Sequence, residues 1–143
     1  MESAIFACPA SWERWLPPDT RRLRNMEELA ERTWDILILP SGREAVEGRC
    51  RILLVPGDCP PERVAGVSAA QVVTCGLSHR DTLTLSSLAE PVLCVQRALT
   101  RPDGGIIEPQ EFPLPGLPLP AAEILPLLGL RLLHMPLTTA LSL

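Results

Sequence analysis

Four side chains with catalytic potential lie within seven residues of one another. Cys75 and Ser78 are potential nucleophiles, His79 is a potential general base, and Asp81 is a carboxylate that could orient it. In known catalytic triads, however, these groups come from distant parts of the chain and meet only in the folded protein. His79 also stands beside Arg80, on an expected turn between two strands. We therefore predict a surface loop here and assign no catalytic residue.

Each of four apolar runs is followed by a turn-forming segment. The four turn-forming segments are Cys8-Pro9, Pro40-Ser41-Gly42, Pro56-Gly57-Asp58 and Cys75-Gly76-Leu77-Ser78-His79. Ligands of open parallel sheets bind beyond the carboxyl ends of the strands. Asp58 would hold a ribose hydroxyl or a metal, and backbone N–H groups near the glycines would hold an anion. The alternative is that these segments only turn the chain. The predicted ligand-binding residues are Ser41, Gly42, Gly57, Asp58, Cys75, Gly76, Ser78 and His79.

Missing residue types exclude several functions. The chain has no lysine, which excludes a Schiff base, a lysine general base and a phosphate loop ending in Gly-Lys-Ser/Thr. No GxGxxG, HExxH or GxSxG motif is present. The net charge is −4, whereas binding to nucleic acid phosphates needs clustered basic residues. We expect no nucleic acid partner, no cofactor and no metal, and we favour a function other than catalysis.

The cysteines and the apolar segments indicate where the protein resides. Five cysteines are widely spaced without a CxxC pair, which argues against disulfides and a zinc site. Reduced, buried thiols predict a cytoplasmic location, and the N-terminus has no signal-peptide pattern. Residues 124–143 reach the length of a membrane span, but Arg131, His134 and two prolines interrupt them. We therefore predict a core helix and strand there, not a membrane tail.

Apolar runs alternate with helix patterns through the first half of the chain. Strands are expected over 4–8, 35–39, 51–55 and 70–75, and their lack of polar alternation is typical of parallel strands buried on both faces. Asn25 with Glu28 forms a capping-box pattern, and prolines open a brief helix near 60–64. The cluster Arg21, Arg22 and Arg24 is assigned to the solvated face of a helix. These patterns predict an α/β fold with a Rossmann-like parallel sheet of about four strands.

The pattern changes after Gly76. Residues 82–86 alternate as a half-exposed strand does, 91–99 form another strand, and a turn at 101–105 leads to a hairpin with 106–107. The strands after the change are expected to be antiparallel. A proline-rich return loop then leads to a helix over 121–128 that Gly129 caps, and the apolar tail is expected to dock on the sheet. We predict one α/β domain, 1–143, made of a parallel part (1–76), an antiparallel extension (77–112) and a C-terminal part (113–143).

Part of the chain resembles a known family. The residues that carry the likeness are Val72-Val73-Thr74-Cys75-Gly76-Leu77-Ser78, then Asp81-Thr82-Leu83-Thr84, and later Phe112-Pro113-Leu114-Pro115-Gly116 before a helix. They resemble the later portion of the nucleotide-binding central domain of Mur-type peptide ligases. Those ligases also need a Gly-Lys-Thr/Ser loop, a carbamylated lysine and a His-Asn pair, and this chain has no lysine. The resemblance therefore implies a fold and no ATP-dependent ligation.

Three functional hypotheses remain at this point. The favoured hypothesis is a non-catalytic binding or interaction module that acts with a protein partner or as a homodimer. The family resemblance alone suggests that it acts in a bacterial cell-envelope or sporulation pathway. The second is a nucleotide or small-anion binding protein that uses the strand ends. The third is a cysteine-dependent enzyme that uses Cys75 or Cys59.

Overall fold

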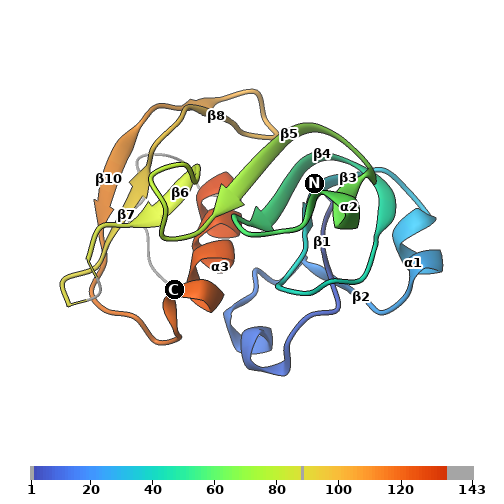
Figure 1. Cartoon of the computed structure of the whole chain (residues 1–143), viewed down its shortest axis with the longest axis horizontal. Helices are drawn as coiled ribbons and strands as arrows, with labels where there is room; N and C mark the ends of the chain where they lie inside the picture. The colour runs from blue at the N-terminus through green and yellow to red at the C-terminus, as the bar shows by residue number, and fades with distance from the viewer. Residues whose placement is uncertain (1, 88, 135–143) are drawn as a thin grey trace.

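A computed structural model describes residues 2–87 and 89–134 and has a mixed α/β fold around one large sheet (Figure 1). The sheet has the strand order β10-β7-β6-β5-β4-β3-β1-β2. Its strands are β1 (Ser3–Phe6), β2 (Arg21–Leu23), β3 (Trp34–Ile38), β4 (Glu47–Pro56), β5 (Gly66–Cys75), β6 (Leu83–Leu85), β7 (Val92–Val95) and β10 (Gln110–Pro113). The α/β character and the mostly parallel sheet are confirmed, but the sheet is larger than the predicted four strands.

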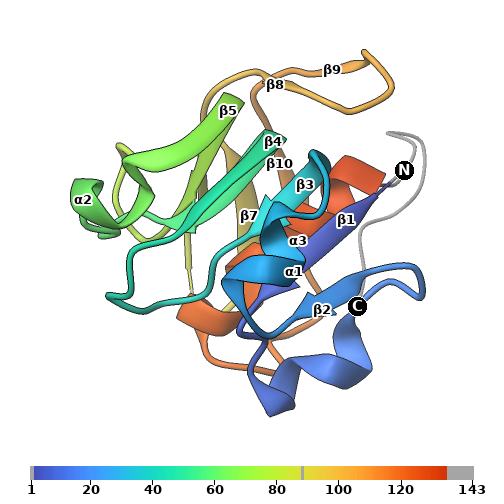
Figure 2. The same cartoon turned by 90° about the vertical axis from the view of Figure 1, so that its right-hand side faces the viewer.

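Three α-helices and a 3₁₀ helix cover this sheet in the described residues. They are η1 (Ala10–Trp15), α1 (Met26–Ala30), α2 (Pro61–Val64) and α3 (Ala121–His134). Apolar residues of α3 pack against one sheet face with Ile36, Ile38 and Leu54, whereas Leu29 of α1 and Val64 of α2 belong to the core on the other face. Figure 2 shows α2 well apart from α3, whereas α1 is drawn in front of part of α3 in this view. The apolar runs of β1, β3 and β4 are therefore buried on both sides, as predicted, whereas the prediction was wrong for β5, in which Val73 is buried but Val72 is 52% exposed.

The change from parallel to antiparallel pairing comes one strand later than expected. β6 runs parallel to β5 through the pair Cys75 and Leu83, and the antiparallel pairs of the large sheet are β6 with β7 and β7 with β10. The loop before β6 is drawn back onto β5 by reciprocal bonds. The Thr82 N–H donates to Thr74 Oγ1 (3.0 Å), and the Thr74 N–H donates to Thr82 Oγ1 (3.5 Å). The chain thus loops at the strand end instead of reversing in a hairpin.

The segment Arg21–Leu23 is a strand, so the prediction of a charged helix face there was wrong. β2 pairs in parallel with β1, leaving its two arginines exposed and Leu23 buried. The reason lies in the helix cap. Asn25 Oδ1 accepts a hydrogen bond from the Glu28 N–H (2.9 Å), which confirms the predicted N-cap and excludes the preceding residues from α1.

Helix α3 does not end at Gly129, contrary to the prediction from the sequence. It continues to His134 and contains both Pro126 and Gly129. Gly129 lies where the helix crosses the sheet, and a Cβ added to it would lie 2.9 Å from Leu83 Cδ1 and 3.2 Å from Leu54 Cδ2. Glycine at this position therefore permits close helix–sheet packing and does not stop the helix. The predicted docking of the apolar tail falls largely on 135–143, outside the described residues.

The hairpin after β7 forms as predicted. β8 (Leu99–Thr100) pairs antiparallel with β9 (Ile106–Ile107), and Gly104 in the turn has φ +89°, a conformation that favours glycine. The next segment was expected to be only a return loop, but its start forms the edge strand β10 against β7. In the parts of the chain that the structure covers, no helix is long and apolar enough to cross a membrane.

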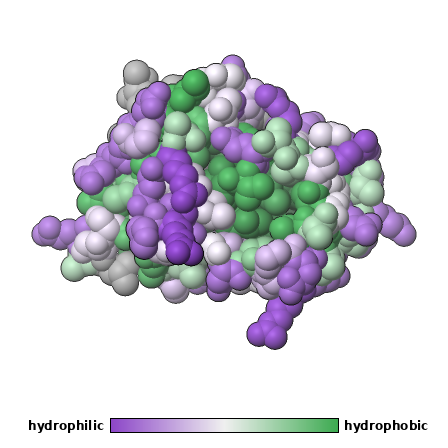
Figure 3. All heavy atoms as spheres, turned by 45° about the horizontal axis from the view of Figure 1, so that its top comes forward, coloured by the Kyte–Doolittle hydropathy of each residue, from purple (hydrophilic) through white to green (hydrophobic). Residues whose placement is uncertain are grey.

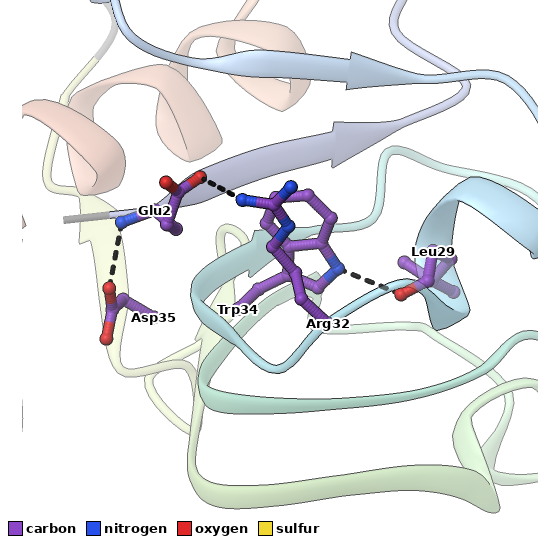
Figure 4. Close-up of polar contacts among 5 residues, drawn as sticks. All are labelled: Glu2, Leu29, Arg32, Trp34 and Asp35. Atoms are coloured by element: carbon purple, nitrogen blue, oxygen red, sulfur yellow. Dashed lines mark hydrogen bonds and ion pairs between the residues drawn. The ribbon is translucent and has the colours of Figure 1, made fainter.

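Polar contacts anchor the start of β1 and β3 to helix α1 (Figure 4). The Glu2 N–H donates to Asp35 Oδ2 (2.8 Å), and the Glu2 carboxylate forms an ion pair with Arg32 (3.3 Å). The Arg32 guanidinium lies over the ring of buried Trp34, whose Nε1–H donates to the Leu29 carbonyl (2.9 Å). This network lies at the amino ends of the strands, so the carboxyl ends remain free to form a site.

Candidate functional site

Two adjoining cavities lie at the carboxyl ends of β3, β4 and β5. The first, of about 620 Å³, reaches Ala122 and Leu125 of α3, and we name it the α3-side cavity. The second, of about 470 Å³, reaches Arg63 of α2, and we name it the α2-side cavity. Figure 1 shows the arrowheads of β4 and β5 side by side next to α3. Because both cavities are lined by Ser41, Pro56 and Asp58, we describe them together as the carboxyl-edge cleft.

The structure brings seven of the eight predicted site residues to this cleft. Ser41, Gly57, Asp58, Cys75, Gly76 and Ser78 line the α3-side cavity, and Gly42 lines the α2-side cavity. The remaining residue, His79, is exposed and lines neither cavity. The geometric part of the prediction thus agrees with the structure, and ligand binding by these residues stays a prediction.

A buried carboxylate lies in the wall of the α3-side cavity. Asp81 is only 6% exposed, and its Oδ2 accepts a hydrogen bond from the Ser78 N–H (3.1 Å). A Cβ on Gly57 would lie 2.7 Å from Asp81 Cγ, and one on Gly76 would lie 2.9 Å from it. The two glycines are therefore required for the close approach of this side chain. Gln96 Nε2 fixes the loop by donating to the backbone carbonyl of Asp81 (2.7 Å).

A buried guanidinium lies in the wall of the α2-side cavity. Arg63 is only 4% exposed, and it donates from Nη1 to the Pro40 carbonyl (2.7 Å) and from Nε to the Glu44 carbonyl (3.1 Å). Its Nη2 lies 3.1 Å from the position that a Cβ on Gly42 would take. The carbonyls orient the guanidinium but do not neutralise its charge. Exposed Arg43 lines the same cavity and adds a second positive group.

Neither buried charge has an oppositely charged partner in residues 2–87 and 89–134. The ion pairs there involve other side chains, and none includes Arg63 or Asp81. Charged groups removed from water are costly unless they are paired. Arg63 was not among the predicted site residues, because nothing in the short segment 60–64 indicates burial. Asp81 was weighed only as a carboxylate that could orient His79, although the turn glycines Gly57 and Gly76 are visible in the sequence.

The geometry at Cys75 disfavours cysteine chemistry. Burial raises the pKa of the Cys75 thiol to about 12, and the negative charge of Asp81 adds to this effect. A thiol is a nucleophile only as the thiolate, which is scarce at neutral pH when the pKa is so high. Burial likewise raises the pKa of Cys50 to about 11. His79, in the neighbouring loop, cannot act as a base for Cys75, because it is exposed and does not line the cavity.

Apolar surface is present away from the cleft. A cavity of about 420 Å³ is formed by Trp15, by Ile124 and Leu128 of α3, and by the proline-rich segment 114–118. Val72 and Ile106 are each more than half exposed, and so is Leu77, which lines the α3-side cavity. Figure 3 shows apolar atoms gathered in the middle of one face, with polar atoms around them. These features are compatible with a protein partner, but they do not indicate its chemistry.

Comparison of the chain with known protein families, with curated proteins and with solved structures finds no match.

Proposed function

We propose that this chain is a non-catalytic binding domain that holds a small anionic ligand in the carboxyl-edge cleft. The observation that carries the proposal is Arg63, a guanidinium buried beside a cavity with no carboxylate paired to it. A phosphate or carboxylate group bound there would supply the missing negative charge, and guanidinium groups match both anions with two parallel hydrogen bonds. Arg43 at the rim would add to the attraction.

The proposal includes a doubly wound, Rossmann-like parallel part. Its support is the strand order β2-β1-β3-β4-β5, which is the flavodoxin-like order of doubly wound sheets. In such sheets ligands lie outside the carboxyl ends of the strands, where the cleft is found. A cytoplasmic location belongs to the proposal too, supported by five free cysteines. Kinship with the Mur ligase central domain rests on the sequence alone.

The test is a titration with inorganic phosphate at constant ionic strength. A ligand that binds only the folded state raises the melting temperature by mass action, so phosphate should stabilise the protein more than chloride does. Arg43→Gln, at an exposed position, should reduce this response, and Arg63→Gln should reduce it further. The matched control is Arg97→Gln, an exposed arginine outside both cavities, which should respond like the unaltered protein.

Two results would refute the proposal. The first is a melting temperature that does not change with phosphate, with pyrophosphate or with sugar phosphates. The second is a phosphate response that is the same in Arg43→Gln and in the unaltered protein. Because Arg63 also holds two loop carbonyls, Arg63→Gln is interpreted only if circular dichroism shows a folded protein. Arg43 is exposed, so Arg43→Gln still tests the proposal if Arg63→Gln does not fold.

A further inference from the structure

We infer that the ligand of the carboxyl-edge cleft is dipolar, with an anionic group at one end and an ammonium group at the other. This inference rests on the proposed function and extends it to the second cavity. Its basis is that the cleft contains two buried, unpaired charges of opposite sign, Arg63 in the α2-side cavity and Asp81 in the α3-side cavity.

The two charges do not neutralise each other. They line different cavities, and no ion pair within residues 2–87 and 89–134 joins them. Ser41, Pro56 and Asp58 line both cavities, so one ligand can contact both sides. A ligand with a single charge would satisfy only one side and leave the other buried charge without a partner.

Asp81 is suited to receive a cationic donor. Its Oδ2 is held by the Ser78 N–H, and in the described residues no donor contacts its Oδ1. The carboxylate lies in the space that side chains at Gly57 and Gly76 would otherwise take. Asp58 is exposed and lines both cavities, and exposed Arg80 also lines the α3-side cavity, so Asp81 is the buried carboxylate on this side. An ammonium group would form charge-assisted hydrogen bonds with these oxygens.

A cavity of about 620 Å³ accommodates a ligand the size of a monosaccharide. The inference therefore names aminated phosphate esters, such as an amino sugar phosphate, as the ligand class. Such a molecule would place its phosphate at Arg63 and Arg43 and its ammonium at Asp81.

The test compares three probes by calorimetry at constant ionic strength: inorganic phosphate, glucose 6-phosphate and glucosamine 6-phosphate. The two sugars differ only in an ammonium in place of a hydroxyl. The unaltered protein should bind glucosamine 6-phosphate about tenfold more tightly than glucose 6-phosphate, the factor expected for one charge-assisted bond. Asp81→Asn should remove this preference, so that the variant binds the two sugar phosphates with equal affinity. Asp19→Asn, at an exposed position outside both cavities, is the matched control and should keep the preference.

The possible failures are distinguishable. Equal affinity for the two sugar phosphates in the unaltered protein would refute the dipolar ligand and leave anion binding intact. Preference for the amino sugar that persists in a folded Asp81→Asn would also refute it. Absence of binding by all three probes would remove the proposed function itself. The first comparison needs no variant, so the inference stays testable if Asp81→Asn does not fold.

Discussion

The carboxylate of Asp81 occupies the space that a side chain on Gly57 would need, and Gly76 faces the same carboxylate from the next strand end. These residues come from two different loops, after β4 and after β5. Their contact explains why each of the two strands is followed directly by a glycine. It also links the stability of this edge of the sheet to the candidate site.

Replacement of Gly57 by alanine should destabilise the protein through this contact. The added methyl group would overlap the Asp81 carboxylate, and overpacking of this kind costs about 1–3 kcal/mol. Urea unfolding measures the change. Gly116→Ala is the matched control, because nothing lies within 4 Å of a Cβ at that position, and it should change the free energy of unfolding by less than about 0.5 kcal/mol. In an Asp81→Ala background, Gly57→Ala should cost much less, and an additive double mutant would contradict the proposed contact.

Alkylation should leave Cys75 unmodified in the folded protein. Its thiol is buried, with a pKa raised to about 12, so little thiolate forms at neutral pH. Cys50 should be protected for the same reason, whereas half-buried Cys59 should react. Iodoacetamide treatment followed by peptide mass spectrometry distinguishes these positions, with urea-unfolded protein as the control. Modification of Cys75 faster than that of a free cysteine would instead support a cysteine-dependent enzyme.

Loss of the Asn25 cap should weaken the start of α1. Asn25→Ala removes the acceptor for the Glu28 N–H and should lower the free energy of unfolding by about 1 kcal/mol. Asn25→Ser keeps an acceptor oxygen and should be nearly neutral. Chemical denaturation of both variants is the measurement. An equal effect of alanine and serine would show that the cap bond does not contribute to stability.

His134 should make the protein less stable in mild acid. Burial lowers the pKa of His134 in the folded state below 6.5, and its Nε2 is hydrogen-bonded to Ser3 Oγ (3.2 Å). The unfolded chain, whose histidine pKa is about 6.5, therefore binds a proton more readily than the folded chain. The contribution of neutral His134 is present above about pH 6.5 and is lost as the pH falls from there through the lower pKa of the folded state.

His134→Asn should flatten this part of the stability curve, which denaturation at pH 7.5 and at lower pH values measures. His79→Gln, at an exposed position, is the matched control. If His134→Asn keeps the same slope as the unaltered protein, the acid sensitivity arises elsewhere in the chain.

The sequence by itself determined the features that depend on neighbouring residues. Uninterrupted apolar runs identified β1, β3, β4 and β5, the Asn25–Glu28 spacing identified the cap of α1, and Asp103-Gly104-Gly105 identified the hairpin turn. The rule that ligands bind at the carboxyl ends of parallel strands selected eight candidate residues, and seven of them lie at one edge of the sheet in the structure. The predictions of the strands, the cap and the turn succeeded because each depends on side chains within a few positions of one another, whereas ligand binding at this edge stays a prediction.

Only the tertiary structure decided which strands are neighbours, where α3 ends, and which charges are buried. Gly129 continues a helix because Leu83 and Leu54 press against it, and neither residue is near it in sequence. Arg63 and Asp81 look like ordinary surface residues in the sequence, but distant segments exclude water from both. Burial of a charge depends on everything packed around it, and for that reason the two residues that carry the functional proposals could be recognised only in the folded chain.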